Sequence, residues 1–168
     1  VTVTGVTGDG VLRLDLNDAD NSILDPSGNF LSSTAQLGDE TYTIDNTGPL
    51  VNTINRGAAP GANPTLAASV EFDITFNEAI QTIDLTDVVL TTVSGTATGT
   101  PSAVVGAGTS WTVTVSGITG SGDIRLDLND ANNSILDALG NSISINTHTG
   151  DQTYTIDSDK TTTVNPPS

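Results

Sequence analysis

A close internal repeat constrains this 168-residue chain more than any other feature of its sequence. Residues 1–45 align with residues 113–157 without a gap, at a constant offset of 112, and 29 of the 45 positions are identical. Arg13–Asp20 (RLDLNDAD) returns as Arg125–Asn132 (RLDLNDAN). A period of this length is typical of tandem domains of about 100 residues that each form one β-sandwich.

The repeat also predicts the domain boundaries. Residues 46–157 form one complete unit, and residues 1–45 correspond to the C-terminal part of a preceding unit. Residues 158–168 (SDKTTTVNPPS) are mostly polar and carry two adjacent prolines, Pro166 and Pro167, as expected of a linker or tail.

Strand signals recur through the complete unit. Apolar residues alternate with polar ones in 70–76, 111–115, 124–128 and 154–156, and residues 88–93 form a further β-rich run. Stretches rich in Gly and Pro, at 57–64 and 95–101, are the predicted breaks. No segment shows a sustained helical period, so the pattern predicts an antiparallel β-sandwich. Its expected core includes Phe72, Trp111, Val113 and Leu126.

The order of these segments resembles the bacterial Ig-like repeats of large secreted and cell-surface adhesins. The resemblance rests on VEFDITFNEAI, IDLTDVVL, WTVTVSGITGSGDIRLDL, ILDALGN and YTIDNTGP, and it covers nearly the whole chain. It implies an all-β fold of immunoglobulin-like antiparallel β-sandwich repeats, arranged as tandem rods that calcium often stiffens. The stretch Asn52–Pro64 departs from that family pattern.

Charge and composition narrow the classes of partner. Four Lys and Arg residues stand against twenty Asp and Glu residues, which gives a formal charge of −16. This field repels nucleic acid and anionic lipid, so neither is an expected partner. No apolar run approaches the ~20 residues of a membrane span. The absence of Cys, the few Lys residues and the high acidity favour an extracellular location, secreted or on a bacterial cell surface.

Oxygen-bearing side chains crowd the loop that follows each RLDL segment. Calcium takes six to eight oxygen ligands, so these loops are the first candidate for a calcium site. The candidate ligands are Asp15, Asn17, Asp18, Asp20 and Asp25 with Asn29 in the first copy, and Asp127, Asn129, Asp130, Asn132 and Asp137 with Asn141 in the second. Because Asn132 replaces Asp20, the second copy is expected to bind calcium more weakly.

A structural reading of the same residues stays open. Residues 25–28 (Asp-Pro-Ser-Gly) have the residue types of a type I turn, and the other Asp and Asn residues can cap backbone amides. Neither the EF-hand pattern nor the glycine-rich nonapeptide of calcium-binding β-rolls is present.

A second candidate calcium site lies where one repeat meets the next, among Asp45, Glu78, Asp84, Asp87 and Asp157. An ion there would fix the angle between consecutive domains. The alternative is a solvated acidic linker.

Catalysis is not expected. His148 is the only histidine and lies in a polar stretch, and the chain contains no nucleophile elbow or phosphate-binding loop. The leading hypothesis is a non-catalytic structural or adhesive module whose partners are further copies of the repeat and a surface ligand that the sequence does not identify. Rival hypotheses are a cell-surface filament subunit assembled by β-strand complementation between molecules, and a glycan-binding module. Residues 1–45 are expected to be ordered only through contact with further strands, because their apolar faces lack the rest of a sandwich.

Overall fold

The structure is a computed structural model that describes residues 1–33 and 35–158. The chain divides into two units, Val1–Thr47 and Gly48–Ser168. All pairs of named strands are antiparallel, and the helical content of the described residues is one 3-10 turn, η1 (Leu85–Asp87). The prediction of an all-β, antiparallel sandwich is therefore confirmed. Beyond Ser158, the predicted linker lies outside the described residues.

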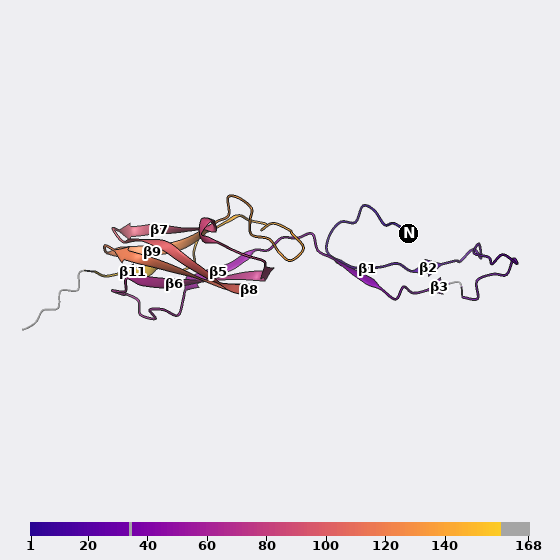
Figure 1. Cartoon of the computed structure of the whole chain (residues 1–168), viewed down its shortest axis with the longest axis horizontal. Helices are drawn as coiled ribbons and strands as arrows, with labels where there is room; N and C mark the ends of the chain where they lie inside the picture. The colour runs from indigo at the N-terminus through magenta and orange to yellow at the C-terminus, as the bar shows by residue number, and fades with distance from the viewer. Residues whose placement is uncertain (34, 159–168) are drawn as a thin grey trace, which may run out of the picture. The chain divides into compact units, whose positions relative to one another are not determined.

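The second unit is a sandwich of two antiparallel sheets, seen as two layers in Figure 1. In one sheet the strand order is β5-β6-β8. In the other, β9 pairs along one edge with β7 and along its opposite edge with β10 and β11. The strands are β5 (Val51–Arg56), β6 (Ser69–Ile80), β7 (Val88–Gly95), β8 (Thr98–Thr119), β9 (Gly122–Asn129), β10 (Thr147–His148) and β11 (Tyr154–Ile156).

The core of this unit comes from the alternating residues of the predicted strands. Phe72 in β6, Val113 in β8 and Leu126 in β9 are fully buried, as predicted. Each such side chain contributes about 1.5–3 kcal/mol through its removal from water. The ring of Tyr154 meets the ring of Phe72 edge to face, with centroids 5.2 Å apart. Aromatic contact thus joins the two sheets.

The prediction that Trp111 lies in the core is wrong. Its ring is half-buried and packs against the edge of the core, while its indole N–H donates to the carbonyl of Gly108. The cause is a turn that the sequence reading missed. Ser102 lies within hydrogen-bonding distance of Thr114 and Ser116, so β8 doubles back on itself through glycines with positive φ and places Trp111 beside that turn. The predicted break at 95–101 is correspondingly shorter, because β8 already begins at Thr98.

The chain enters and leaves the second unit at opposite ends. At the entry end, the carbonyl of Gly48 accepts a hydrogen bond from the hydroxyl of Ser144, in the loop that follows β9. At the exit end, the backbone N–H of Ser158 donates to the hydroxyl of Ser121, which immediately precedes β9. Since β9 spans eight residues, the two ends are separated by about 25 Å. Figure 1 shows this arrangement along the strands of the second unit.

The first unit contains the short strands β1 (Gly10–Arg13), β2 (Leu16–Asn17), β3 (Ala35–Gln36) and β4 (Thr41–Ile44). Their pairing repeats that of β9 with β11 and β10 at the offset of 112. The pairs Gly10 with Ile44 and Leu16 with Gln36 correspond to Gly122 with Ile156 and Leu128 with His148. The sequence repeat is therefore also a repeat of strand register.

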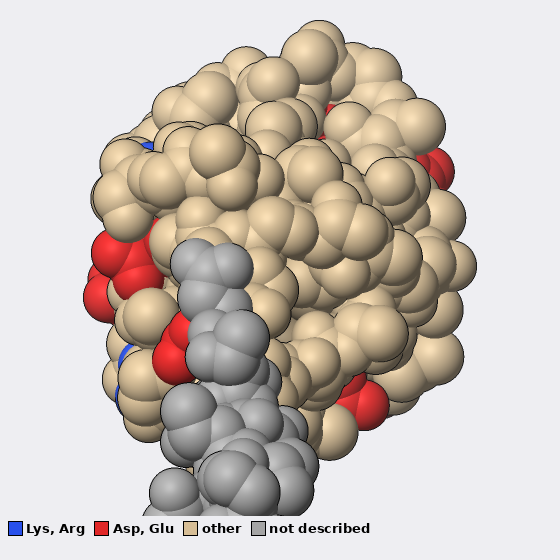
Figure 2. Space-filling view, turned by 90° about the vertical axis from the view of Figure 1, so that its left-hand side faces the viewer, with Lys and Arg blue, Asp and Glu red and all other residues tan. Residues whose placement is uncertain are grey.

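The acidic excess is dispersed over the surface that Figure 2 shows. Acidic side chains form separate red patches there, divided by wide areas without charge. Separation of this kind weakens the repulsion between the acidic side chains on this face.

Candidate metal centre

In the loop after β9, the side chain of Asp130 folds back and accepts hydrogen bonds from backbone N–H groups of the same loop. The carboxylate of Asp130 is fully buried and accepts from the backbone N–H groups of Ser134 and Ile135, at 2.9 and 3.2 Å. Asn132 accepts from the same N–H of Ser134 at 3.2 Å. The first role of these two predicted ligands is to fix the turn that carries the chain from β9 into the following loop.

Asp87 faces the same turn from the opposite direction. Its carboxylate is buried and accepts from the backbone N–H of Asp84 at 2.8 Å and from the hydroxyl of Ser134 at 3.0 Å. That hydroxyl lies 3.4 Å from Asp130, so it stands between two buried carboxylates. Burial raises the pKa of Asp87, and the neighbouring charges of Asp84 and Asp130 add to the rise. The structure thus brings together two acids that the sequence reading assigned to different candidate sites.

Asp84 and Asp87 also begin η1 with reciprocal caps. The carboxylate of Asp84 accepts from the backbone N–H and the hydroxyl of Thr86, which lower the pKa of Asp84. Such a capping box satisfies backbone donors that a short helical turn leaves open. Both acids therefore have a structural role whether or not an ion binds near them.

Asp137 begins the next turn. Its carboxylate accepts from the backbone N–H groups of Leu139 and Asn141 at 2.8 Å and from the side-chain amide of Asn141 at 2.7 Å. Burial acts to raise the pKa of Asp137, but these hydrogen bonds outweigh it and the pKa falls below the ordinary value. Asp137 is accordingly held as a carboxylate, the form that a cation requires.

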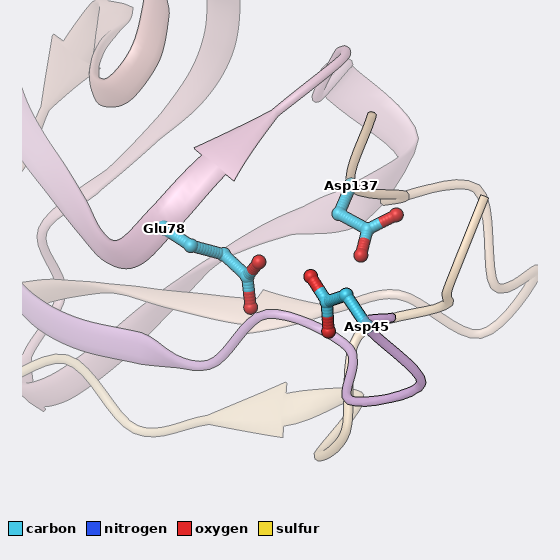
Figure 3. A group of neighbouring side chains, drawn as sticks. All are labelled: Asp45, Glu78 and Asp137. Carbon is cyan, nitrogen blue, oxygen red and sulfur yellow. The ribbon is translucent and has the colours of Figure 1, made fainter. Parts of the chain in front are cut away.

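Glu78 in β6 brings a second carboxylate to Asp137. A carboxylate oxygen of Glu78 and one of Asp137 lie within 4.8 Å of each other. Figure 3 shows Glu78 reaching from the end of β6 toward the loop that carries Asp137. Two carboxylate oxygens at this separation can share one divalent cation, because calcium–oxygen distances are about 2.3–2.6 Å. Asp45, which Figure 3 also labels, belongs to the first unit, where its carboxylate accepts from the backbone N–H of Thr47.

Asp127 is placed for an ion pair instead. It receives two hydrogen bonds from the guanidinium of Arg125, at 2.7 and 3.1 Å, and further bonds from Thr91 and the backbone N–H of Gly150. Burial tends to raise the pKa of Asp127, but these donors together lower it. Asn129 lies at the exposed end of β9, opposite Thr147. These two predicted ligands do not join the group around Asp130 by any bond that the structure shows.

The first copy repeats these local bonds. Asp15 pairs with Arg13, and Asp18 accepts from the backbone N–H groups of Ser22 and Ile23. Asp25 accepts from the backbone N–H groups of Ser27 and Asn29 and from the side-chain amide of Asn29, as the predicted turn requires. Of the other candidate ligands in this copy, Asn17 lies in β2 and Asp20 is exposed in the loop.

The two ends of the second unit carry different parts of the predicted boundary site. Glu78, Asp84 and Asp87 lie near the entry end, whereas Asp157 follows β11 at the exit end, where its backbone N–H donates to the carbonyl of Thr65. Within one unit these acids therefore do not form one site.

Ser134, whose hydroxyl contacts the carboxylates of Asp87 and Asp130, was not among the predicted site residues. The repeat offered a signal for this residue, because a serine stands four residues after the buried aspartate in both copies: Ser22 after Asp18, and Ser134 after Asp130. The only histidine, His148, lies in β10 with its ring 3.4 Å from Asp151, a single exposed contact. Comparison with protein-family models, with curated proteins and with solved structures finds no match. Among the described residues, no helix is long and apolar enough to cross a membrane.

Proposed function

We propose that this protein is a non-catalytic structural or adhesive module of an extracellular bacterial repeat protein, one link in a tandem rod that calcium stiffens. The observation that carries the proposal is the entry of the chain at one end of the second unit and its exit at the other. Together with the 112-residue period, this polarity lets successive sandwiches continue end to end without a return crossing. The resemblance to bacterial Ig-like adhesin repeats agrees with such an arrangement.

The same polarity supports an extended rather than a compact assembly. Each added repeat would lengthen the rod by about the length of its strands, roughly 25–40 Å for 8–12 residues. Chains of one, two and three copies of residues 46–157 should therefore show, in small-angle X-ray scattering, a maximum dimension that rises linearly with the number of repeats. A maximum dimension that stays nearly constant would contradict the rod.

Calcium enters the proposal through charge and ligand chemistry. A net charge of −16 opposes compaction, and oxygen donors gather at the entry end around Glu78 and Asp137. Oxygen-only ligands with no His or Cys favour calcium over transition metals.

The test compares thermal melting of the full chain in millimolar calcium and in chelator, at matched ionic strength. Binding to the native state alone stabilises by about 2.7 kcal/mol when calcium exceeds its Kd a hundredfold. The fluorescence of Trp111, the only tryptophan, reports the second unit. Magnesium should substitute poorly, because it demands a tighter octahedral shell.

A matched pair of variants locates the ion. The double variant Glu78→Gln, Asp137→Asn removes two charges but leaves at position 137 a side-chain oxygen that can still accept from the backbone N–H groups of the turn. It should abolish most of the calcium-dependent shift. Asp39→Asn with Glu40→Gln removes the same charge from the first unit and should leave the shift intact. An equal melting temperature with calcium and with chelator in the parent chain rejects the calcium part of the proposal.

A further inference from the structure

The first unit has an apolar face that is left open to solvent. Leu12, Leu14, Leu16 and Tyr42 are between 42% and 72% exposed. Leu12, Leu14 and Tyr42, together with Val3, line much of a groove of about 650 Å³. The corresponding residues of the second unit, Ile124, Leu126, Leu128 and Tyr154, are at most 1% exposed. Since strand register is the same in both copies, the difference lies in what covers the face.

The second unit shows which strands give that cover. Phe72 of β6 packs edge to face on Tyr154, and the hydroxyl of Tyr154 lies 3.1 Å from each of the carbonyl oxygens of Gly57 and Ala59, which follow β5. The guanidinium of Arg56 lies 5.9 Å from the centre of the same ring. The exposed ring of Tyr42 is therefore matched in shape and polarity to a β5–β6 pair.

An open strand edge accompanies the open face. In the second unit β7 pairs with β9 along the edge opposite β11. In the first unit, β1 is the counterpart of β9 and pairs with β4, the counterpart of β11. The described residues place no strand on the other edge of β1. A Cβ added to Gly122 would lie 2.1 Å from the carbonyl oxygen of Ser94 in β7, whereas one added to Gly10 would meet nothing within 4 Å. The space that β7 fills in one copy is open in the other.

A polar match completes the comparison. Ser134 donates toward Asp87, which is contributed by η1 just before β7, as well as toward Asp130. Its counterpart Ser22 keeps only the second of these contacts, to Asp18 at 3.1 Å. An acid in the position of Asp87 would restore the first.

We propose that the apolar face and open edge of Val1–Thr47 bind the front half of another repeat, a polypeptide segment with the pattern of Asn46–Thr112. This occupant supplies strands equivalent to β5, β6 and β7 at once, so that a single added edge strand does not suffice. The proposal rests on the tandem-repeat part of the proposed function and is independent of its calcium part.

The test extends the full chain at its N-terminus with a second copy of its own residues 46–112, joined directly to Val1 so that the 112-residue period continues. Amide hydrogen exchange is then measured in chelator for β1 and β4. Exchange of these amides should slow by about a hundredfold or more relative to the original chain, because local opening then requires loss of a packed core. The amides of β9 and β11 provide the internal reference.

A control separates specific cover from mere lengthening. The same extension with Phe72→Asp in the added segment alone should leave β1 and β4 exchanging as in the original chain. Protection in the extended chain that is lost in this control supports the proposal. Protection that survives Phe72→Asp overturns it, as does unchanged exchange in the extended chain, whether or not the added segment folds.

Light scattering on the original chain tests the alternative that a second copy of the chain covers the apolar face. A dimer whose β1 and β4 amides are already protected means that an intact second copy covers the face without supplying an unpaired front half, which overturns the proposal. Because calcium is absent throughout, success here with no calcium effect on melting removes only the calcium part of the proposed function. If the extension does not protect β1 and β4 but calcium clearly raises the melting temperature, only the proposal that a front-half segment covers the first unit is rejected.

Discussion

Because the two copies share their local sequence, one copy serves as a control for the other. We compare the loss of unfolding free energy caused by Leu126→Ala with that caused by Leu14→Ala. Both leucines occupy the same repeat position, in RLDL. Leu126 is fully buried in β9, whereas Leu14 is 58% exposed. The same change in the same local sequence therefore tests burial alone.

The magnitude for Leu126→Ala follows from the structure. Three carbon groups leave the core at about 0.8 kcal/mol each. The cavity that remains adds to this, so the total loss is about 3–5 kcal/mol. Leu14→Ala removes contacts that are already half in water, and the expected change is within about 0.5 kcal/mol.

Urea unfolding followed by Trp111 fluorescence gives the comparison. At an m-value of about 1.5 kcal/mol/M, a loss of 3 kcal/mol lowers the midpoint by about 2 M. Leu14→Ala should leave this midpoint unchanged. Its effect on the first unit, which Trp111 does not report, is read from the amide exchange of β1 and β4 and should stay within about 0.5 kcal/mol. Equal losses from both variants, or a loss below about 1 kcal/mol for Leu126→Ala, would refute the reasoning. In the chain extended by residues 46–112, Leu14→Ala should instead weaken the first unit about as much as Leu126→Ala weakens the second.

Three further predictions test individual contacts. Tyr154→Phe removes the hydroxyl that binds two carbonyl oxygens and should cost about 1 kcal/mol in urea unfolding, whereas Tyr42→Phe, at an exposed ring, should cost nothing measurable. Asp87→Asn should raise the melting temperature at pH 7, because burial and nearby carboxylates raise the pKa of Asp87. The parent chain gains stability from this group as the pH falls through the raised pKa toward the unfolded-state value of about 3.9, and melts from pH 7 to 4.5 should show that gain vanish in the variant. Gly122→Ala should destabilise the second unit through its contact with β7, and Gly10→Ala should lower the protection of β1 far less, with the difference read by amide exchange.

The strand pattern was predictable because period-two alternation depends on neighbouring residues alone. Val70, Phe72 and Ile74 point inward in β6 as the sequence predicts, and β9 behaves in the same way. Trp111 shows where this reasoning ends. The alternation places it inward, but the reversal of β8 beside Gly108 moves its ring to the edge of the core. That reversal depends on glycine backbone conformations, which alternation does not register.

The acidic loops were predictable as a group, although not in their partners. The turn that begins at Asp25 was predicted from local residue types, and Asp137 begins a turn with the same carboxylate contacts. The meeting of Asp87 with Asp130 could not, because 43 residues separate them in the sequence and only the sandwich brings η1 against the loop after β9. Non-local pairs of this kind follow from sheet order, which a single sequence does not specify.

The first unit separates what local sequence determines from what packing determines. Arg13 with Asp15, Asp18 with Ser22 and Asp25 with Asn29 form the same bonds as their counterparts, although the face beneath them is open. The loop geometry is therefore encoded in the loop, through carboxylates that accept from nearby backbone N–H groups. Burial of the leucines and the tyrosine is not encoded there, since identical residues are buried in one copy and exposed in the other. A run of acids after an RLDL strand thus has a sufficient structural cause before any ion is considered, and a calcium-dependent shift in melting is the observation that would add a second cause.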